Sequence, residues 1–260
     1  MDSPQWLDVD WPAPPNVRAI STLRTGGVSV GAFASLNLGA HVGDEPAAVA
    51  ENRRRLKMAL QLDADPLWLN QVHGVDVVTA DARTDCTAPT ADASVCKVRG
   101  RACVIMTADC LPVLFCDREG TRVGAAHAGW RGLASGVLGA TVNELGVAAD
   151  KLMAWLGPAI EQNAFEVGPE VREEFVTRNA ATAPAFVANA QGRWQADLYA
   201  LARLELARLG VREVHGGTYR CYEDAARFFS YRRDRGKTGR MASMVWLEQR
   251  KHPNNSVIPA

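Results

Sequence analysis

The segment that decides the fold spans residues 102–132 and reads ACVIMTADCLPVLFCDREGTRVGAAHAGWRG. Short apolar runs bounded by polar turn residues predict buried strands. Three such runs lie in it: Ala102–Thr107, Val113–Asp117 and Arg122–His127. In the residues that follow, Leu133–Leu145 place leucine and valine side chains on one helical face, and Gly146 is a typical helix end. We therefore expect a strand-rich core that continues directly into a helix.

Patterns of the same kind extend this core in both directions. Strands are expected at Asn16–Leu23, Leu67–Val72, Val75–Ala80, Leu152–Leu156 and Met241–Leu247. Helices are expected at Ala48–Leu60, Pro169–Arg178 and Asp197–Leu209, and a loop at residues 179–192. Strands and helices do not alternate strictly, which favours an α+β fold over a doubly wound sheet. We expect a single layered domain over residues 1–260, with mixed β-sheets flanked by helices.

The composition argues against several classes of protein. The 260 residues carry 29 Lys and Arg against 29 Asp and Glu, so the basic excess of nucleic-acid-binding proteins is missing. No run of 18 apolar residues could span a membrane, and the acidic N-terminus shows no apolar signal segment. Six cysteines without a CxxC pair indicate a reduced, cytoplasmic setting with most thiols buried. Nothing in the sequence indicates an oligomeric state.

Three segments place a histidine or a cysteine where an apolar strand ends: NQVHG at 70–74, ADCLP at 108–112 and AAHAGWRG at 125–132. Strand ends and the loops beside them commonly carry functional residues. Two imidazoles and one thiol form a ligand set suited to zinc, and here they belong to His73, Cys110 and His127. Three protein ligands would leave a fourth coordination position open for water or substrate, and zinc lowers the pKa of a bound water toward about 7.

The same residues support a competing hypothesis. Cys110 would be a nucleophile activated by His127, as in acyl transfer by a Cys–His pair, with Asp109 or Asn70 orienting the imidazole. A metal would hold the thiolate as a ligand and suppress that role, so the two hypotheses exclude each other. The sequence leaves both open, together with the alternative that the two histidines and the cysteine are ordinary structural residues.

Two segments rich in arginine could bind a negatively charged substrate. Gly129 and Gly132 flank Arg131 at a predicted helix start, where free backbone N–H groups bind anions. Near the C-terminus, residues 228–241 combine aromatic rings with arginines, which could stack on a base and clamp phosphate. The alternative is structural in both cases: an ordinary strand-to-helix turn, and aromatic core residues beside a solvated basic loop.

NQVHG, TADCLP and AAHAGWRG together resemble the laccase-domain family, also described as multicopper polyphenol oxidase-like. The resemblance covers roughly residues 16–248 and continues through STLRTGGVS, SLNLGAHVGD, WLGPAI, FEVG, FFSYRRD and TGRMAS. Members are described as zinc-containing purine nucleoside phosphorylases, and some as peptidoglycan editing factors. The family is similar in fold to bacterial toxin deamidases that use a Cys–His pair. The resemblance therefore implies an α+β fold of packed mixed sheets with outer helices.

The resemblance also implies a role for individual residues. The metal ligands would be His73, Cys110 and His127. The cofactor would be zinc, with copper as a replacement, because Cu²⁺ outcompetes Zn²⁺ at such sites. The catalytic residues would be Cys110, His127 and Asp109. The residues that bind nucleoside or phosphate would be Arg131, Asn37, Asn70, Arg233 and Arg240.

The activity that the resemblance implies is phosphorolysis of adenosine, guanosine, inosine and S-methyl-5′-thioadenosine, together with deamination of adenosine. In phosphorolysis, phosphate attacks the anomeric carbon while positive charge develops on the ribose. Zinc and Arg131 would align the phosphate, and such positioning lowers the barrier to reaction. Asp109 would act as an acid–base group or orient a ligand. The expected partners are therefore small molecules, a nucleoside and phosphate, rather than nucleic acid or a membrane.

Two further activities are associated with the same family. Peptidoglycan editing would remove L-Ser from a UDP-MurNAc-linked precursor by amide hydrolysis, which zinc or the Cys110–His127 pair could carry out. A copper-dependent polyphenol oxidase fits poorly, because blue-copper oxidation needs many histidines and the chain has five, of which only His41 and His215 remain as extra ligands. The sequence departs from the family pattern around Asp92 and at Cys221–Tyr222, and neither departure is expected to touch the metal ligands.

Overall fold

The computed structural model describes residues 3–81 and 87–249. Its largest element is a six-stranded mixed sheet in the order β12-β8-β6-β7-β4-β3. The four central strands β8, β6, β7 and β4 run antiparallel to one another. At the two edges, β12 pairs in parallel with β8 and β3 pairs in parallel with β4. The bounds of the six strands are β3 Val77–Thr79, β4 Ala93–Cys96, β6 Leu111–Asp117, β7 Val123–Ala128, β8 Leu152–Leu156 and β12 Glu213–Gly216.

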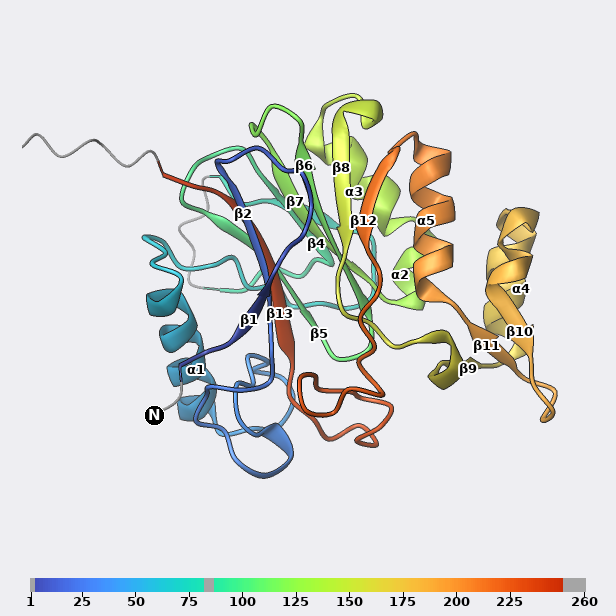
Figure 1. Cartoon of the computed structure of the whole chain (residues 1–260), viewed down its shortest axis with the longest axis horizontal. Helices are drawn as coiled ribbons and strands as arrows, with labels where there is room; N and C mark the ends of the chain where they lie inside the picture. The colour runs from blue at the N-terminus through green and yellow to red at the C-terminus, as the bar shows by residue number, and fades with distance from the viewer. Residues whose placement is uncertain (1–2, 82–86, 250–260) are drawn as a thin grey trace, which may run out of the picture.

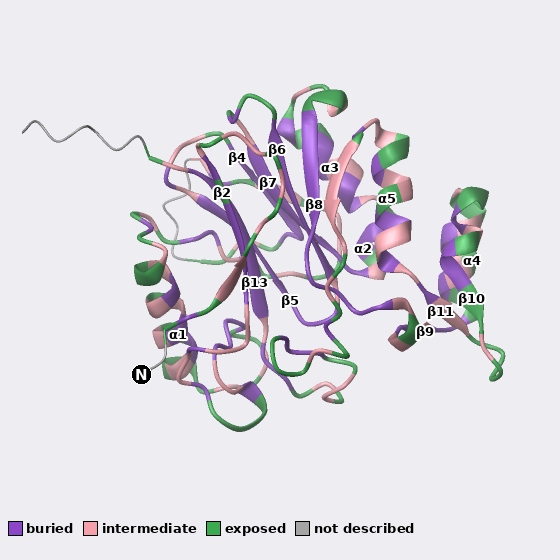
Figure 2. Ribbon diagram, viewed as in Figure 1, coloured by how far each residue is buried: buried purple, intermediate pink, exposed green. Residues whose placement is uncertain are grey.

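A four-stranded antiparallel sheet in the order β1-β2-β13-β5 packs against one face of the six-stranded sheet. Its strands are β1 Trp6–Asp8, β2 Val17–Thr22, β5 Ala102–Thr107 and β13 Met241–Leu247. Side chains from both sheets form one apolar cluster between them, in which Ile105 and Val245 meet Leu114 and Trp155. Figure 2 shows β5, β6, β7, β8 and β13 as buried along their whole length, whereas the edge strand β1 is only partly buried. Strands covered on both sides explain why the sequence shows unbroken apolar runs there.

Helices cover the two outer faces, so the chain folds in four layers (Figure 1). On the four-stranded sheet lies α1, Pro46–Ala59, whose Leu56 packs on Ile20 and Met244. On the six-stranded sheet lie α2 Trp130–Ser135, α3 Val137–Leu145 and α5 Leu198–Leu209. A small three-stranded sheet and α4, Pro169–Arg178, project beyond them. The strands of that sheet are β9 Glu166–Val167, β11 Trp194–Ala196 and β10 Phe186–Ala188.

This architecture confirms the predicted α+β class with mixed sheets and outer helices. The strands expected near residues 16–23, 75–80, 102–127, 152–156 and 241–247 are present, as are the helices expected at 48–60, 169–178 and 197–209. Within the described residues, none of the helices is long and apolar enough to cross a lipid bilayer.

Three predictions about local structure are wrong. Residues 67–72 form no strand and make only isolated bridges, from Leu67 to Cys103 and from Asn70 to Thr90. The helix expected at 133–145 is two helices, because Gly136 between α2 and α3 has a φ of 99°, in the left-handed region. The loop expected at 179–192 contains a 3-10 turn at 180–185 and strand β10.

Substitution of Gly136 tests the break between α2 and α3. An alanine Cβ at this position would meet no atom within 4 Å, so Gly136→Ala would be penalised only for its backbone conformation. We expect the free energy of unfolding to fall by about 1–2 kcal/mol. Urea unfolding followed by circular dichroism measures this change.

The matched control lies one turn further along the chain. Gly139 is inside α3, and an alanine Cβ there would lie 3.5 Å from Leu209 Cδ2, an ordinary contact. Gly139→Ala should therefore stabilise the protein by about 0.5–1 kcal/mol, because glycine is a poor helix former. Equal effects of the two substitutions would contradict the role assigned to Gly136.

Candidate metal centre and pocket

The structure brings His73, Cys110 and His127 together at the ends of three chain segments. Their ligand atoms all lie within 4.8 Å of one another. The Cys110 Sγ is 3.8 Å from His73 Nε2, and the rings of the two histidines have centroids 4.7 Å apart. Strand register explains part of this arrangement. Antiparallel pairing sets Pro112 of β6 opposite His127 of β7, so the turn that carries Cys110 lies beside that imidazole.

Asp92, just before β4, orients both histidines. Its fully buried carboxylate accepts a hydrogen bond from His127 Nδ1 at 2.8 Å and from the backbone N–H of His73 at 2.9 Å. It also accepts hydrogen bonds from the backbone N–H groups of Val72 and Gly74, at 3.1 and 2.7 Å. Burial alone would raise the pKa of Asp92, but the hydrogen bonds from His127 and the backbone outweigh it, and the pKa is lowered.

This contact corrects one sequence-based expectation. The segment around Asp92 was expected not to touch the proposed ligands, yet its carboxylate binds the ring of one and the backbone of another. An ionised Asp92 accepts a hydrogen bond from the N–H at His127 Nδ1, so the proton stays on Nδ1 and His127 Nε2 faces Cys110 and the pocket. The sequence contains a signal for this role of Asp92: it is the lone carboxylate among the small residues ADASVC, a pattern typical of a buried segment. A buried acid needs a dedicated hydrogen-bond partner.

The thiol and the imidazole of the cluster polarise each other. Burial would raise the pKa of Cys110, but the charge of His127 and hydrogen bonds from both histidines lower it to about 6. Burial would lower the pKa of His127, but Cys110 and Asp92 raise it to about 9. Near neutral pH the thiol is therefore held as a thiolate, which is both the nucleophilic form and the form that binds metals.

The cluster could hold a metal ion, and its chemistry fits zinc. Two imidazole nitrogens and one thiolate are a ligand set of catalytic zinc sites, in which a fourth position stays open. The backbone leaves room for these groups only because residue 129 is glycine. A Cβ on Gly129 would lie 2.9 Å from Cys110 Sγ and 3.0 Å from His73 Cδ2. Gly129, which the sequence suggested as part of an anion-binding helix start, thus makes room for the cluster by lacking a side chain.

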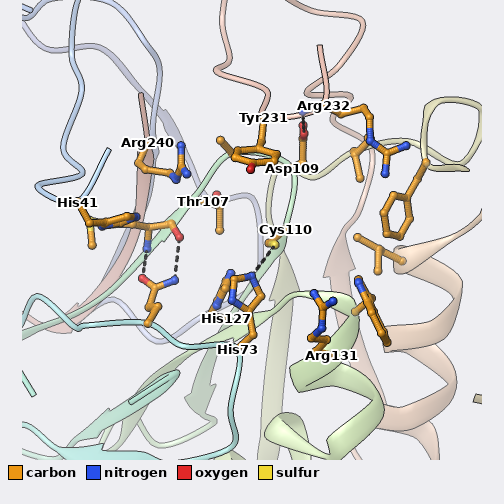
Figure 3. Close-up of a pocket in the computed structure, with 17 residues that line it drawn as sticks. His41, His73, Thr107, Asp109, Cys110, His127, Arg131, Tyr231, Arg232 and Arg240 are labelled. Atoms are coloured by element: carbon orange, nitrogen blue, oxygen red, sulfur yellow. Dashed lines mark hydrogen bonds between the residues drawn. The ribbon is translucent and has the colours of Figure 1, made fainter. Parts of the chain in front are cut away.

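The cluster forms the floor of a pocket of about 480 Å³ (Figure 3). Asp109 lines the pocket in a left-handed conformation, with a φ of 91°. Its Oδ2 accepts the backbone N–H of Arg232 at 2.7 Å, and its buried Oδ1 has no hydrogen-bond partner among the described residues. Burial raises the pKa of this carboxyl. Of the residues predicted to bind substrate, Arg131 and Arg240 also line the pocket.

Three residues predicted to bind substrate do not line the pocket. Asn37 is fully buried, and its Oδ1 accepts the backbone N–H of Arg240 at 2.9 Å. Asn70 is exposed and donates to Thr90 Oγ1 at 3.1 Å. Arg233 forms an ion pair with Asp234 and donates hydrogen bonds to three backbone carbonyls, those of Cys221, Tyr222 and Phe228. These side chains hold the loops around the pocket in place, which explains their residue types without contact to a ligand.

Sequence reasoning missed several residues of the pocket. Gln71 clamps strand β5, because its amide donates to the Met106 carbonyl at 2.9 Å and accepts the Met106 N–H at 2.8 Å. His41 lines the pocket although the sequence suggested it only as an extra copper ligand. Most of the apolar and aromatic lining also escaped prediction, since its members come from distant segments: Trp130, Ile160, Phe165 and Leu198. Tyr231, which also lines the pocket, lies in the segment 228–241 whose rings were expected to stack on a base.

Over residues 18–248 the chain matches the family described as multi-copper polyphenol oxidoreductase laccase, and it belongs to this family. Among its relatives, a Pseudomonas aeruginosa protein named purine nucleoside phosphorylase is 59% identical over 244 residues, covering 94% of this chain and 98% of its own. The Escherichia coli protein YfiH carries the same name and is 51% identical over 237 residues, covering 91% and 96%.

Solved structures agree with the family and the fold. The crystal structure of a Neisseria meningitidis protein matches with a TM-score of 0.91 at 53% identity, covering 94% of this chain and 100% of that chain. YlmD from Geobacillus stearothermophilus matches with a TM-score of 0.87 at 31% identity, covering 96% and 98%. The resemblance seen in the sequence motifs is therefore confirmed.

Removal of the charge on Asp92 tests its role in orienting the histidines. Asp92→Asn keeps the size of the side chain but loses the charge that stabilises the protonated Nδ1 of His127. We expect zinc affinity to fall by about 10- to 100-fold, the usual effect of losing such a partner. Competition with a chromophoric chelator measures the affinity. The control is Asp76→Asn, an exposed carboxylate three residues after His73, and an unchanged affinity in Asp92→Asn would refute the role.

A methyl group added at Gly129 tests the space around the cluster. Gly129→Ala places a carbon 2.9 Å from Cys110 Sγ, a distance that real Cβ atoms essentially never show, and 3.0 Å from His73 Cδ2, which is a tight contact, so the cluster must shift. We expect a loss of zinc affinity with the fold retained, checked by chelator competition and circular dichroism. Gly74→Ala is the matched control, because its Cβ would lie 3.5 Å from the nearest atom, Asp92 Oδ2. Equal zinc affinities for the two variants would contradict the packing role of Gly129.

Proposed function

We propose that this protein is a zinc-dependent purine nucleoside phosphorylase that acts on adenosine, guanosine, inosine and S-methyl-5′-thioadenosine, and that it also deaminates adenosine. The observation that carries the proposal is the convergence of His73, Cys110 and His127 on the floor of one pocket that also contains guanidinium groups and aromatic rings. The names of the Pseudomonas aeruginosa and Escherichia coli relatives support it.

The pocket offers a suitable group for each part of a nucleoside and phosphate pair. Its aromatic lining, which includes Trp130 and Phe165, suits a flat purine ring. Arg131 and Arg240 suit negatively charged oxygens, because a guanidinium can bind two of them at once. The volume of about 480 Å³ is in the range of small-molecule sites.

Phosphorolysis places two demands on these residues. A phosphate oxygen forms a bond to C1′ of the ribose while the C1′–N9 bond breaks and its electron pair leaves with the purine. A guanidinium group of the pocket holds the phosphate in line with that bond, and such positioning replaces an unfavourable encounter in solution. The purine leaves more readily when it gains a proton. We assign this proton transfer to Asp109, whose carboxyl lines the same pocket.

The proposed metal ligands are His73, Cys110 and His127, and Asp92 keeps His127 in the tautomer that ligation requires. A zinc ion bound there supplies a Lewis acid next to the substrate, and copper would compete for the same donors. Deamination replaces the amino group at C6 of adenine by water and releases ammonia. In that reaction the purine ring, rather than the ribose, must lie against the cluster, so the pocket must accept the nucleoside in two orientations.

A second candidate is peptidoglycan editing, the hydrolytic removal of L-Ser from a UDP-MurNAc-linked precursor. One observation favours it: Cys110, His127 and Asp92 stand in the order nucleophile, base and orienting carboxylate, with the thiol already ionised near neutral pH. In this alternative Cys110 attacks the amide carbonyl, the C–N bond breaks, and the imidazolium donates a proton to the departing serine. Water then cleaves the resulting thioester, which releases the carboxylate and regenerates the Cys110 thiol. It requires a metal-free thiolate, whereas the phosphorylase uses Cys110 as a ligand.

Product analysis separates these activities. Zinc-loaded protein is incubated with adenosine, with and without phosphate, and products are resolved by chromatography. We expect adenine and ribose 1-phosphate only when phosphate is present, and inosine in either condition. Guanosine, inosine and S-methyl-5′-thioadenosine are assayed in the same way. If none of the four nucleosides is converted, the phosphorylase proposal fails, and release of serine from a UDP-linked seryl precursor tests the second candidate.

A cysteine variant distinguishes ligand from nucleophile. Cys110→Ser should lose activity in step with its loss of zinc and recover part of it when excess zinc restores occupancy. The matched control is Cys96→Ser, because the Cys96 thiol donates to the Val98 carbonyl and a hydroxyl can make the same hydrogen bond. Full loss of activity in Cys110→Ser with zinc still bound would instead favour the nucleophilic role.

A further inference from the structure

Arg240 is partly buried, whereas the other two arginines that line the pocket, Arg131 and Arg232, are exposed. None of the three forms an ion pair with a carboxylate among the described residues. Its Nη1 donates to the carbonyls of Thr238 and Gly239, both at 3.0 Å, and its Nε and Nη2 have no hydrogen-bond partner among the described residues. Within residues 3–81 and 87–249, no carboxylate lies within 4.0 Å of its guanidinium. Burial lowers the pKa of Arg240, yet the group stays charged at neutral pH. A cation in this state is best stabilised by an anion that enters the pocket.

The N-terminal loop at residues 37–41 holds Arg240 rigidly in place. Asn37 Oδ1 accepts the backbone N–H of Arg240 at 2.9 Å, and the backbone N–H of Leu38 donates to the Arg240 carbonyl at 3.2 Å. A Cβ on Gly39 would lie only 2.7 Å from Arg240 Cγ, so the loop packs directly on the aliphatic stem. Asn37 itself is tied to Asp44 by a hydrogen bond of 2.9 Å. The guanidinium is therefore preorganised, which lowers the entropic cost of binding an anion.

His41 extends from the same loop and lies on the same side of the pocket as Arg240 (Figure 3). Burial and the nearby charges of Arg240, Arg53 and His127 lower its pKa. His41 is therefore a neutral imidazole whose N–H can donate to an anionic oxygen. Together, a fixed guanidinium and a neutral imidazole form a surface that recognises an oxyanion through several donors.

The opposite side of the cluster has a different character. The Arg131 guanidinium carbon lies 4.5 Å from the centroid of the Trp130 ring, and that of Arg232 lies 5.5 Å from the Phe165 centroid. Arg232 also donates to the Glu166 carbonyl at 3.1 Å. Arg240 also lies over a ring, with its guanidinium carbon 5.7 Å from the Tyr231 centroid. The two sides therefore differ in burial, because Arg131 and Arg232 are exposed whereas Arg240 is partly buried, and the flat rings of Trp130 and Phe165 lie on the side of the exposed arginines. Figure 3 shows Arg240 and His41 on one side of the cluster and Arg131 on the other.

The direction of phosphorolysis requires two unlike ends of this kind. The phosphate oxygen must approach C1′ from the side opposite the departing purine, so phosphate and base lie on opposite sides of the ribose. We propose that phosphate binds at the end formed by Arg240 and His41, that the purine stacks at the end formed by Trp130 and Phe165, and that Asn37 is a positioning residue for Arg240. This inference rests on the proposed phosphorylase function and moves the phosphate away from Arg131, where the sequence placed it.

Kinetics with two substrates test this division of the pocket. The KM for phosphate and the KM for inosine are measured separately for zinc-loaded protein carrying Arg240→Gln, His41→Ala, Asn37→Ala or Arg131→Gln. We expect Arg240→Gln to raise the KM for phosphate by about tenfold or more, because it loses charged hydrogen bonds, and to change the KM for inosine less than about threefold. Arg240→Lys should recover part of the loss. Arg131→Gln should instead raise the KM for inosine more than the KM for phosphate.

The positioning role of Asn37 has its own readout. Asn37→Ala should raise the KM for phosphate and leave the KM for inosine nearly unchanged, although Asn37 does not reach the pocket; a general loss of stability would affect both. Binding of inorganic phosphate, followed by calorimetry, provides a measurement independent of turnover and should weaken in Arg240→Gln. Arg212→Gln, an exposed arginine outside the pocket lining, serves as the charge control.

The outcomes separate the two proposals. In one outcome the wild-type protein releases hypoxanthine from inosine when phosphate is present, but the KM for phosphate rises in Arg131→Gln and not in Arg240→Gln. The phosphorylase function then stands, and the proposed division of the pocket is wrong. If the wild-type protein binds phosphate through Arg240 but converts no nucleoside, the phosphorylase function fails and an oxyanion site remains. If Arg240→Gln changes neither phosphate binding nor either KM, the inference is overturned.

Discussion

The buried carboxylate of Asp92 is the constraint on which the candidate metal centre depends. Its four hydrogen bonds, to the His127 ring and to three successive backbone N–H groups at 72–74, join two segments that lie far apart in the chain. A carboxylate removed from water is stable only when its oxygens are satisfied. The same bonds that keep Asp92 ionised therefore fix the loop that carries His73 and the tautomer of His127, and Cys110 completes the cluster from the neighbouring turn.

The pocket around this centre is built by loops from both ends of the described chain. The β6–β7 pair supplies the floor, while the N-terminal loop near residues 37–41 and the C-terminal loop near residues 228–240 close one side over it. Buried hydrogen bonds join these loops, and the bond from Arg240 N–H to Asn37 is the central one. Binding groups are thus held by side chains that never meet the substrate, which explains why some polar residues look functional in the sequence and prove to be supports.

Much of the fold could be predicted because its long elements have strong local patterns. The buried strands β5, β6, β7 and β13 appear as apolar runs, and α4 and α5 have a proline or an aspartate at their start. Strands of two to four residues, such as β4, β9 and β12, carry too little periodicity to be seen. The break at Gly136 was missed because a glycine within an amphipathic pattern is compatible with either a continuous helix or a left-handed joint.

The sequence by itself determined the α+β class, the family, and the three residues that form the cluster, because each of these residues lies within a distinctive motif. Only the tertiary structure decided that Asp92 orients the histidines, that Asn37 lies behind Arg240, and that Arg233 and Asn70 lie away from the pocket. The physical reason is range. Local patterns report which face of a strand or helix is buried, whereas contact between residues two hundred positions apart depends on sheet order and on how loops pack over the sheet edge.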